Sequence, residues 1–211
     1  MSSSLERNSE ARSRKLSKKA AIVGIDLSIK RASSICLYSW GAKRIIITKA
    51  YSEDEIASSA LSVATKGSIL VVMDSPLSEE RKKRYRDLDR LASMLGCRLL
   101  PISMHPMAFL AERGMRISKF IKEALPDATI VETHPSCAAK VLGFKGTYEM
   151  VKALLGIDAR GDDADAVACC LAGIFLLMGL GIEISSEDNK DIFILPTRLG
   201  PNDRERLFYR F

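Results

Sequence analysis

Acidic side chains end three short apolar runs in this chain of 211 residues. The runs AAIVGID, SILVVMD and ATIVE close on Asp26, Asp74 and Glu132. Short apolar runs of this kind are typical of strands that are buried on both faces. The carboxyl ends of parallel strands meet at one edge of an α/β sheet, where ligands bind. We therefore expect these three carboxylates to lie at the same edge.

Two more carboxylates open the longest apolar run of the chain, within the segment GDDADAVACC. Asp162 and Asp165 are three residues apart, which places them on the same face of a helix. Asp163 is turned away from Asp165 and is expected to cap the helix or to face solvent. Acidic residues also stabilise a helix N-terminus by about 0.3–1 kcal/mol each. That structural role accounts for Asp162 and Asp163 better than for Asp165, which has apolar neighbours.

These carboxylates would repel one another if they met in one place, and a divalent cation offsets such repulsion. Carboxylate oxygens are hard ligands that suit Mg²⁺ or Mn²⁺. The sequence therefore predicts a metal site with Asp26, Asp74 and Asp165 as ligands. Glu132 and Asp162 are expected to support it.

The elements that must position these residues follow from the hydrophobic pattern. Strands that alternate with helices indicate an α/β sheet. Residues 33–40 and 43–51 form a hairpin around Gly41-Ala42, so the first three strands are expected to be antiparallel and later ones parallel. Ser52 and Glu55 have the spacing of a capping box. We expect helices at residues 52–66, 78–95, 107–125, partly within 136–156, and at 162–180, and short strands at 97–102 and 192–195.

Composition indicates a soluble globular protein, with 47% hydrophobic and 27% charged residues. The net charge is +6, and six basic against two acidic residues precede Ala20. We expect a disordered basic tail at 1–19, one domain at 20–197 and a basic C-terminal tail at 198–211. The absence of Gln, together with only three Asn, fits a heat-adapted source.

No membrane association is expected, because the longest apolar run is shorter than the ~20 residues of a membrane span. The first 19 residues contain no apolar stretch of the kind found in a signal peptide. The five cysteines form no C-x-x-C pair, which predicts reduced thiols used as small core residues. A cytoplasmic location is therefore expected.

The ordered motifs resemble the RNase H-like superfamily and, more narrowly, the predicted-nuclease family known as domain of unknown function 429. The matching motifs are Gly24-Ile25-Asp26, Met73-Asp74-Ser75-Pro76, Arg84 through Asp89 to Leu95-Gly96, Glu132-Thr133-His134-Pro135 and Asp162-Asp163-Ala164-Asp165-Ala166. The last motif is also similar to the D-x-x-D-A-x-A helix of RuvC-type Holliday-junction resolvases. Family members often carry glycines after the first strand, where this chain has Ile29-Lys30-Arg31-Ala32.

The resemblance implies an RNase H-like mixed sheet of five strands with helices on both faces. In that fold the first and fourth strands are neighbours, so that Asp26 and Asp74 would face Asp165 on the last helix. Such an arrangement suits two metal ions roughly 3.5–4 Å apart, one activating a water and one stabilising the leaving oxygen of a phosphodiester.

Basic residues near these motifs are candidates for phosphate contacts. Lys30 and Arg31 follow Asp26 closely, and Arg84 and Arg86 belong to a segment with six basic residues and Tyr85 at positions 81–90. A solvated helix face also explains that segment. His134 is suited to orient a carboxylate, to shuttle a proton, or to serve a structural role beside Pro135.

These observations predict a Mg²⁺- or Mn²⁺-dependent nuclease that hydrolyses the phosphodiester bonds of nucleic acid. Motifs of P-loop NTPases, dinucleotide-binding proteins, the common serine hydrolases and zinc proteases are absent from the sequence. Two other functions are compatible with the same residues: a Mg-nucleotide-dependent phosphotransferase of the same superfamily fold, and a non-catalytic module that binds nucleic acid or a partner. The residues distinguish neither DNA from RNA nor a monomer from an oligomer.

Overall fold

The computed structural model describes residues 21–64, 69–78, 84–185 and 192–197. The expected tails at 1–19 and 198–211 lie outside these residues. The strands are β1 (Ala21–Asp26), β2 (Ser33–Ser39), β3 (Arg44–Ala50), β4 (Ile69–Asp74), β5 (Thr129–Glu132), β6 (Gly181–Ser185) and β7 (Ile192–Pro196). The helices are α2 (Glu53–Ser62), α3 (Asp87–Met94), α4 (His105–Ala124), α5 (Pro135–Val141), α6 (Thr147–Leu155) and α7 (Asp162–Leu177).

The strands form one mixed sheet with the order β3-β2-β1-β4-β5-β7-β6. β2 is antiparallel to both β1 and β3, whereas β4 is parallel to β1 and β5 is parallel to β4. These directions confirm the RNase H-like fold class, including the contact between the first and fourth strands. Within the described residues the sheet has seven strands, rather than the five that the resemblance implies. β7 confirms the strand expected at 192–195, and it pairs antiparallel with β6, which was not expected, so that the two extend the sheet beyond β5.

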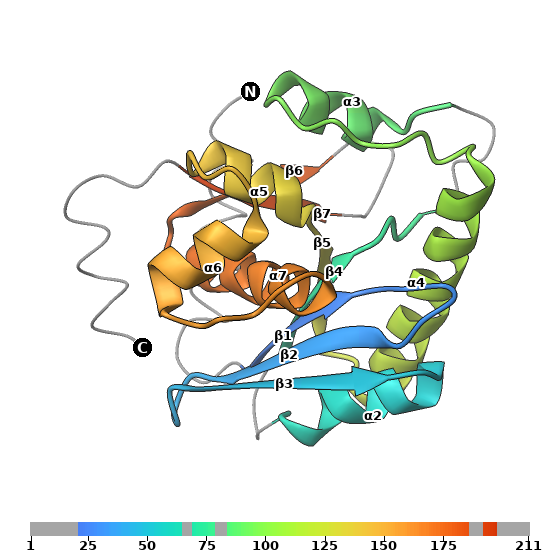
Figure 1. Ribbon diagram of the computed structural model, residues 1–211. Helices are drawn as coiled ribbons and strands as arrows, with labels where there is room; N and C mark the ends of the chain where they lie inside the picture. The colour runs from blue at the N-terminus through green and yellow to red at the C-terminus, as the bar shows by residue number, and fades with distance from the viewer. Residues whose placement is uncertain (1–20, 65–68, 79–83, 186–191, 198–211) are drawn as a thin grey trace.

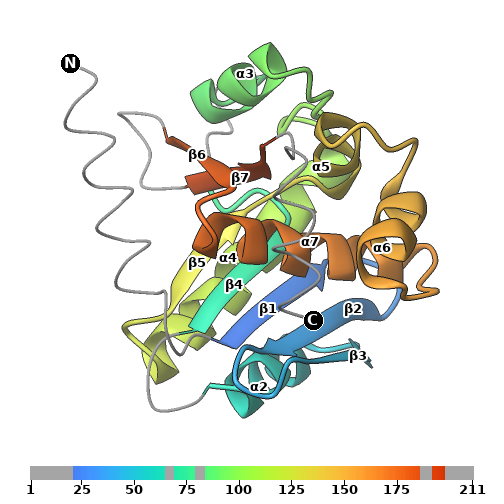
Figure 2. The same cartoon turned by 90° about the vertical axis from the view of Figure 1, so that its left-hand side faces the viewer.

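Helices cover both faces of the sheet, as expected (Figures 1 and 2). α7 crosses one face, where Ile22, Leu70 and Val72 belong to the same apolar cluster as its side chains. α2 and α4 cover the other face, against the alternate residues Val23 and Val71. Successive residues of a strand point to opposite faces. The continuous apolar runs that predicted buried strands therefore supply both cores.

α7 lies very close to β1 because the strand has a glycine at the point of contact. A Cβ atom on Gly24 would lie 2.2 Å from the carbonyl oxygen of Ala166 and 2.4 Å from the backbone nitrogen of Cys170. Any larger residue would push the helix away from the sheet. Gly24 therefore sets the distance between the end of β1 and the start of α7, where the predicted acidic residues lie.

Several expected element boundaries differ from the structure. The strand expected at 97–102 is absent from that described stretch, which is irregular. The helix expected at 78–95 is shorter, since α3 starts only at Asp87. The helix expected at 162–180 ends at Leu177, and Gly179 with φ +73° turns the chain toward β6. The capping box of Ser52 and Glu55 is confirmed.

The cysteines divide into two groups. Cys36, Cys169 and Cys170 are buried free thiols, as expected. The prediction was wrong for Cys97 and Cys137, which form a disulfide with their Cα atoms 5.2 Å apart. These two residues are separated by 40 positions, and the fold brings them together in the apolar cluster beside β7. Sequence spacing alone could not reveal that contact.

None of the helices within the described ranges is long and apolar enough to cross a membrane.

Candidate functional site

Asp26 and Asp74 lie side by side at the carboxyl edge of the sheet. They are register partners in the parallel pair β1–β4, each as the last residue of its strand. Parallel neighbours of this kind are about 4.8 Å apart. Strand alternation places Asp26 on the same face as Gly24, which touches α7. The two carboxylates therefore face the start of α7.

Asp165 and Asp162 approach this pair from the first turn of α7. The charges of Asp165 and Asp162 both raise the pKa of Asp26, and that of Asp165 also raises the pKa of Asp74. The structure thus brings together four of the five predicted carboxylates. We call Asp26, Asp74, Asp162 and Asp165 the carboxylate cluster.

The carboxylate cluster is electrostatically strained. Burial, followed by Asp165 and Asp162, raises the pKa of Asp26 from 3.8 to about 7, against the opposing effects of Lys49 and Arg31. Burial also raises the pKa of Asp74 well above its ordinary value, with further increases from Asp26, Asp165 and Glu132. The pKa of Asp165 rises for the same first reason, although a hydrogen bond with Thr147 lowers it. A cation beside Asp26, Asp74 and Asp165 would counter these increases and favour the ionised carboxylates.

Glu132 occupies a different position from the one expected. Its register partner is Met73, which packs on the α2 and α4 face of the sheet, so Glu132 points away from α7. Both of its carboxylate oxygens accept hydrogen bonds from Arg86, at 2.6 and 2.7 Å. The backbone nitrogen of Leu77 donates a further bond of 2.7 Å. Glu132 therefore acts on the cluster through its charge on Asp74, while its oxygens are held by the protein.

Arg86 was expected to contact substrate, but its side chain is only 2% exposed. Besides Glu132, it binds Asp89 at 2.7 Å, so one buried cation is shared by two buried carboxylates. Such a guanidinium cannot reach a phosphate on the surface without leaving both partners unpaired. Arg86 is therefore part of a buried ion-pair network and does not offer a surface contact to phosphate.

The other predicted binding residues lie near the surface. Lys30 and Arg31 are exposed on the loop after β1, and Arg31 forms an ion pair with Asp162 at 3.4 Å. Arg84 is exposed and lies over the ring of Tyr85. His134 caps α5, where its Nδ1 accepts a hydrogen bond of 3.3 Å from the backbone nitrogen of Cys137. Burial lowers the pKa of His134, which favours this neutral, accepting form.

The sequence analysis missed the polar residues around the cluster. Lys49 on β3 lies 2.7 Å from Asp163 and also donates to Ser34 on β2, whose hydroxyl donates to Asp163. Asp163 is therefore ion-paired at a partly exposed position. Thr147 at the start of α6 is the hydrogen-bond partner of Asp165. Strand and helix patterns give no signal for these contacts, because the partners are far apart in the chain.

A divalent metal fits the chemistry of this donor set. Among the described residues, no group of three or more His, Cys, Asp or Glu side chains is arranged so that it could hold a metal ion. Mg²⁺ usually binds through one or two carboxylates, with water and substrate phosphate completing its ligands. The register pair Asp26 and Asp74 supplies such carboxylates. A cation there would also offset the repulsion that raises their pKa values.

Comparisons with known proteins give a structural similarity only. No protein-family model and no curated protein matches the chain, so the narrower resemblance to domain of unknown function 429 gains no support. Among solved structures, RuvC of T. thermophilus in complex with a Holliday junction substrate is similar, with a TM-score of 0.46 and 14% sequence identity. That similarity covers 75% of this chain and 96% of the RuvC chain.

Proposed function

We propose that this protein is a Mg²⁺- or Mn²⁺-dependent nuclease that hydrolyses phosphodiester bonds of nucleic acid at the carboxylate cluster. The observation that carries the proposal is the register pairing of Asp26 with Asp74 opposite Asp165. Burial raises the pKa of all three carboxylates and neighbouring acids raise each further, so a bound cation would favour their ionised form. The carboxyl edge of an α/β sheet is also where ligands bind.

In this proposal Asp26 and Asp74 would bind the metal directly, and Asp165, which faces them from α7, would act on it through its charge or through a bound water. A divalent metal in such a site would supply a nucleophilic water and stabilise the leaving oxygen of a phosphodiester. Asp162 stays beside the metal ligands through its ion pair with Arg31. Thr147 orients Asp165 by its hydrogen bond. The charge of a protonated His134 lowers the pKa of Asp165. Lys30 and Arg31 are placed on the loop that follows Asp26, where they can bind phosphate.

The experiment compares Asp26→Asn and Asp165→Asn with the wild type, using Mn²⁺ and RNA, DNA, hybrid and junction substrates. Each Asn keeps the side-chain volume but removes the charge that holds the cation. We expect at least one substrate to be cleaved by the wild type and both variants to lose about 100-fold or more of that activity. Asp127→Asn is the matched control, because Asp127 precedes β5 at the opposite edge of the sheet.

A metal-binding readout keeps the proposal testable apart from turnover. Mn²⁺ is expected to raise the melting temperature of the wild type and of Asp127→Asn, but not that of Asp26→Asn. Equal activities in wild type and cluster variants would refute the nuclease proposal. Stabilisation by Mg-ATP together with no cleavage of any substrate would favour a phosphotransferase instead.

A further inference from the structure

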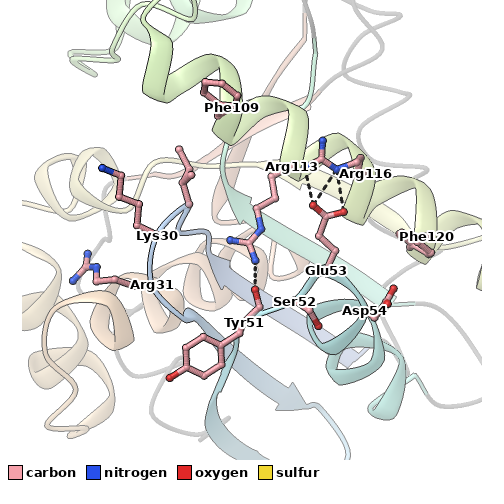
Figure 3. Close-up of a pocket in the computed structure, with 11 residues that line it drawn as sticks. Lys30, Arg31, Tyr51, Ser52, Glu53, Asp54, Phe109, Arg113, Arg116 and Phe120 are labelled. Carbon is pink, nitrogen blue, oxygen red and sulfur yellow. Dashed lines mark hydrogen bonds and ion pairs between the residues drawn. The ribbon is translucent and has the colours of Figure 1, made fainter.

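A second surface lies next to the carboxylate cluster. It is a groove of about 610 Å³ between the loop after β1, the start of α2 and the exposed side of α4 (Figure 3). We call it the α4 groove. Its lining residues are Ile29, Lys30, Arg31, Tyr51, Ser52, Glu53, Asp54, Phe109, Arg113, Arg116 and Phe120.

The wall formed by α4 carries two basic side chains between two aromatic ones. Phe109, Arg113, Arg116 and Phe120 follow the spacing i, i+4, i+7 and i+11, which keeps them on one face of the helix. Figure 3 shows these four side chains along α4, opposite the loop that carries Lys30 and Arg31. The stripe covers about three helical turns, or about 16 Å. It is therefore long enough to follow several units of a polymer.

The two phenylalanines are unusually exposed for apolar residues. Phe109 and Phe120 are each 46% exposed. Tyr51, which also lines the groove, is 73% exposed. A solvated helix face of a soluble protein has no need of two such rings. Exposed aromatic rings flanked by cations are, in contrast, the arrangement on which unpaired bases stack.

The charge of the α4 groove favours a polyanion. Four basic residues line it, against the two carboxylates of Glu53 and Asp54. Arg116 is neutralised by its 2.8 Å ion pair with Glu53. Arg113 donates to the carbonyl oxygens of Ser28 and Tyr51, so its charge is not matched by those partners. Lys30 forms no ion pair among the described residues and is exposed beside them.

The α4 groove and the carboxylate cluster are linked by the loop after β1. Arg31 lines the groove and at the same time binds Asp162 of the cluster. Arg113 of α4 holds the carbonyl of Ser28, two residues after Asp26. A chain bound in the groove would therefore lie against the same loop that leads from Asp26.

We propose that the α4 groove binds a single-stranded segment of nucleic acid, with bases stacked on Phe109 and Phe120 and phosphates bound by Lys30 and Arg113. Duplex bases are already stacked on each other and leave no free face for these rings. The substrate is thus a single strand, or a duplex with a single-stranded end or branch. This inference rests on the proposed function for the identity of the polymer, and it specifies which form of nucleic acid is recognised.

Binding is tested without divalent metal, in EDTA, so that hydrolysis cannot contribute. Fluorescence anisotropy measures the Kd of the full chain for a single-stranded oligothymidylate of about 12 nucleotides, a length within the range of known single-strand sites, and for a duplex of equal length. We expect the single strand to bind more tightly. Phe109→Ala and Phe120→Ala should each raise its Kd about 5- to 100-fold, while changing the duplex Kd less than about twofold.

Conservative and distant variants separate stacking from simple apolar contact. Phe109→Leu keeps much of the apolar area but has no ring, so it should weaken binding nearly as much as Phe109→Ala. Lys30→Gln should reduce the slope of log Kd against log salt by about 0.7, the value for one phosphate contact on a single strand. Met94→Ala on α3, where Met94 is 82% exposed, is the control for truncating an exposed apolar residue.

Circular dichroism confirms the folding of each variant. Cross-linking of the wild type to a 5-bromouracil oligonucleotide tests the α4 groove without any mutation. Cross-links within α4 or at Tyr51 would support the proposal. Cross-links confined to other elements, or Phe variants that bind the single strand as well as the wild type, would overturn it. Concentration-dependent dimerisation that is lost in the Phe variants, with unchanged oligonucleotide binding, would identify a protein interface instead. Tight binding in EDTA without cleavage in Mn²⁺ would leave this inference standing and refute only the nuclease proposal.

Discussion

Asp26→Asn is expected to stabilise the metal-free protein at neutral and alkaline pH. Asp26 must ionise at a partly buried position close to Asp165 and Asp162. The unfolded chain ionises the same carboxyl freely. Replacing the acid by an amide of almost equal volume removes this repulsion while keeping the shape of the side chain.

The size of the effect follows from the pKa of Asp26, which rises from 3.8 to about 7 on folding. Each pKa unit corresponds to about 1.4 kcal/mol, so the full penalty is about 4 kcal/mol above pH 7. Between these pKa values the folded protein retains a proton that the unfolded chain has lost. Wild-type stability therefore falls as the pH rises from about 4 to about 7, and Asp26→Asn lacks this loss. Water at the edge screens part of the repulsion, so we expect a gain of about 2–4 kcal/mol at pH 8.

Urea unfolding in EDTA at several pH values between about 4 and 8 measures this gain, with Asp127→Asn as an exposed-acid control. The gain should be small near pH 4 and largest above pH 7. Mn²⁺ at about 100 times its Kd should then stabilise the wild type and Asp127→Asn by about 2.7 kcal/mol, but not Asp26→Asn. A variant that is less stable than the wild type at pH 8, or a difference that does not change with pH, would refute the electrostatic reasoning.

Three further perturbations test the packing that positions the cluster. Arg86→Met leaves two buried carboxylates without their shared cation and should cost about 3–5 kcal/mol in urea unfolding, whereas Arg84→Met on the surface should change stability by less than about 0.5 kcal/mol. Gly24→Ala places a methyl group against the backbone of α7 and should lower the free energy of unfolding in urea by about 3 kcal/mol or more. An unchanged urea midpoint would contradict the close approach of α7 to β1. Reduction of the Cys97–Cys137 disulfide, which closes a loop across 40 positions, should lower stability by about 4 kcal/mol, and equal unfolding curves with and without dithiothreitol would show that the bond is not formed in solution.

Most of the sheet and the carboxylate cluster could be predicted because they depend on local patterns. Continuous apolar runs marked β1, β4 and β5, and the parallel arrangement then placed Asp26 beside Asp74. The i, i+3 spacing at the start of α7 placed Asp162 and Asp165 on the same side. In each case a short stretch of sequence determines both the element and the position of its acidic residue.

The rest depends on contacts between distant segments. Glu132 has the same local pattern as Asp74, but the parity of β5 turns it to the opposite face, where Arg86 binds it across 46 positions. The ion pair of Lys49 with Asp163 and the disulfide also join elements whose pairing is decided by the whole fold. The hydrophobic pattern predicted a helix to residue 180 and no element at 181–185, where β6 lies. The turn at Gly179 ends the helix early and leads the chain into this strand.

The loop after β1 is where the cluster and the α4 groove meet, and this determines how their roles can be separated. Arg31 serves both, because it lines the groove and binds Asp162, so its substitution would change metal binding and strand binding together. Residues that share a partner couple in their effects, whereas distant residues act additively. Phe120 at the far end of the groove and Asp74 on β4 share no partner among the described contacts, and each therefore reports on one site. Independent losses of strand binding at Phe120 and of cation binding at Asp74 would mean that separate residues bind the two ligands. One short loop would then connect the two sites.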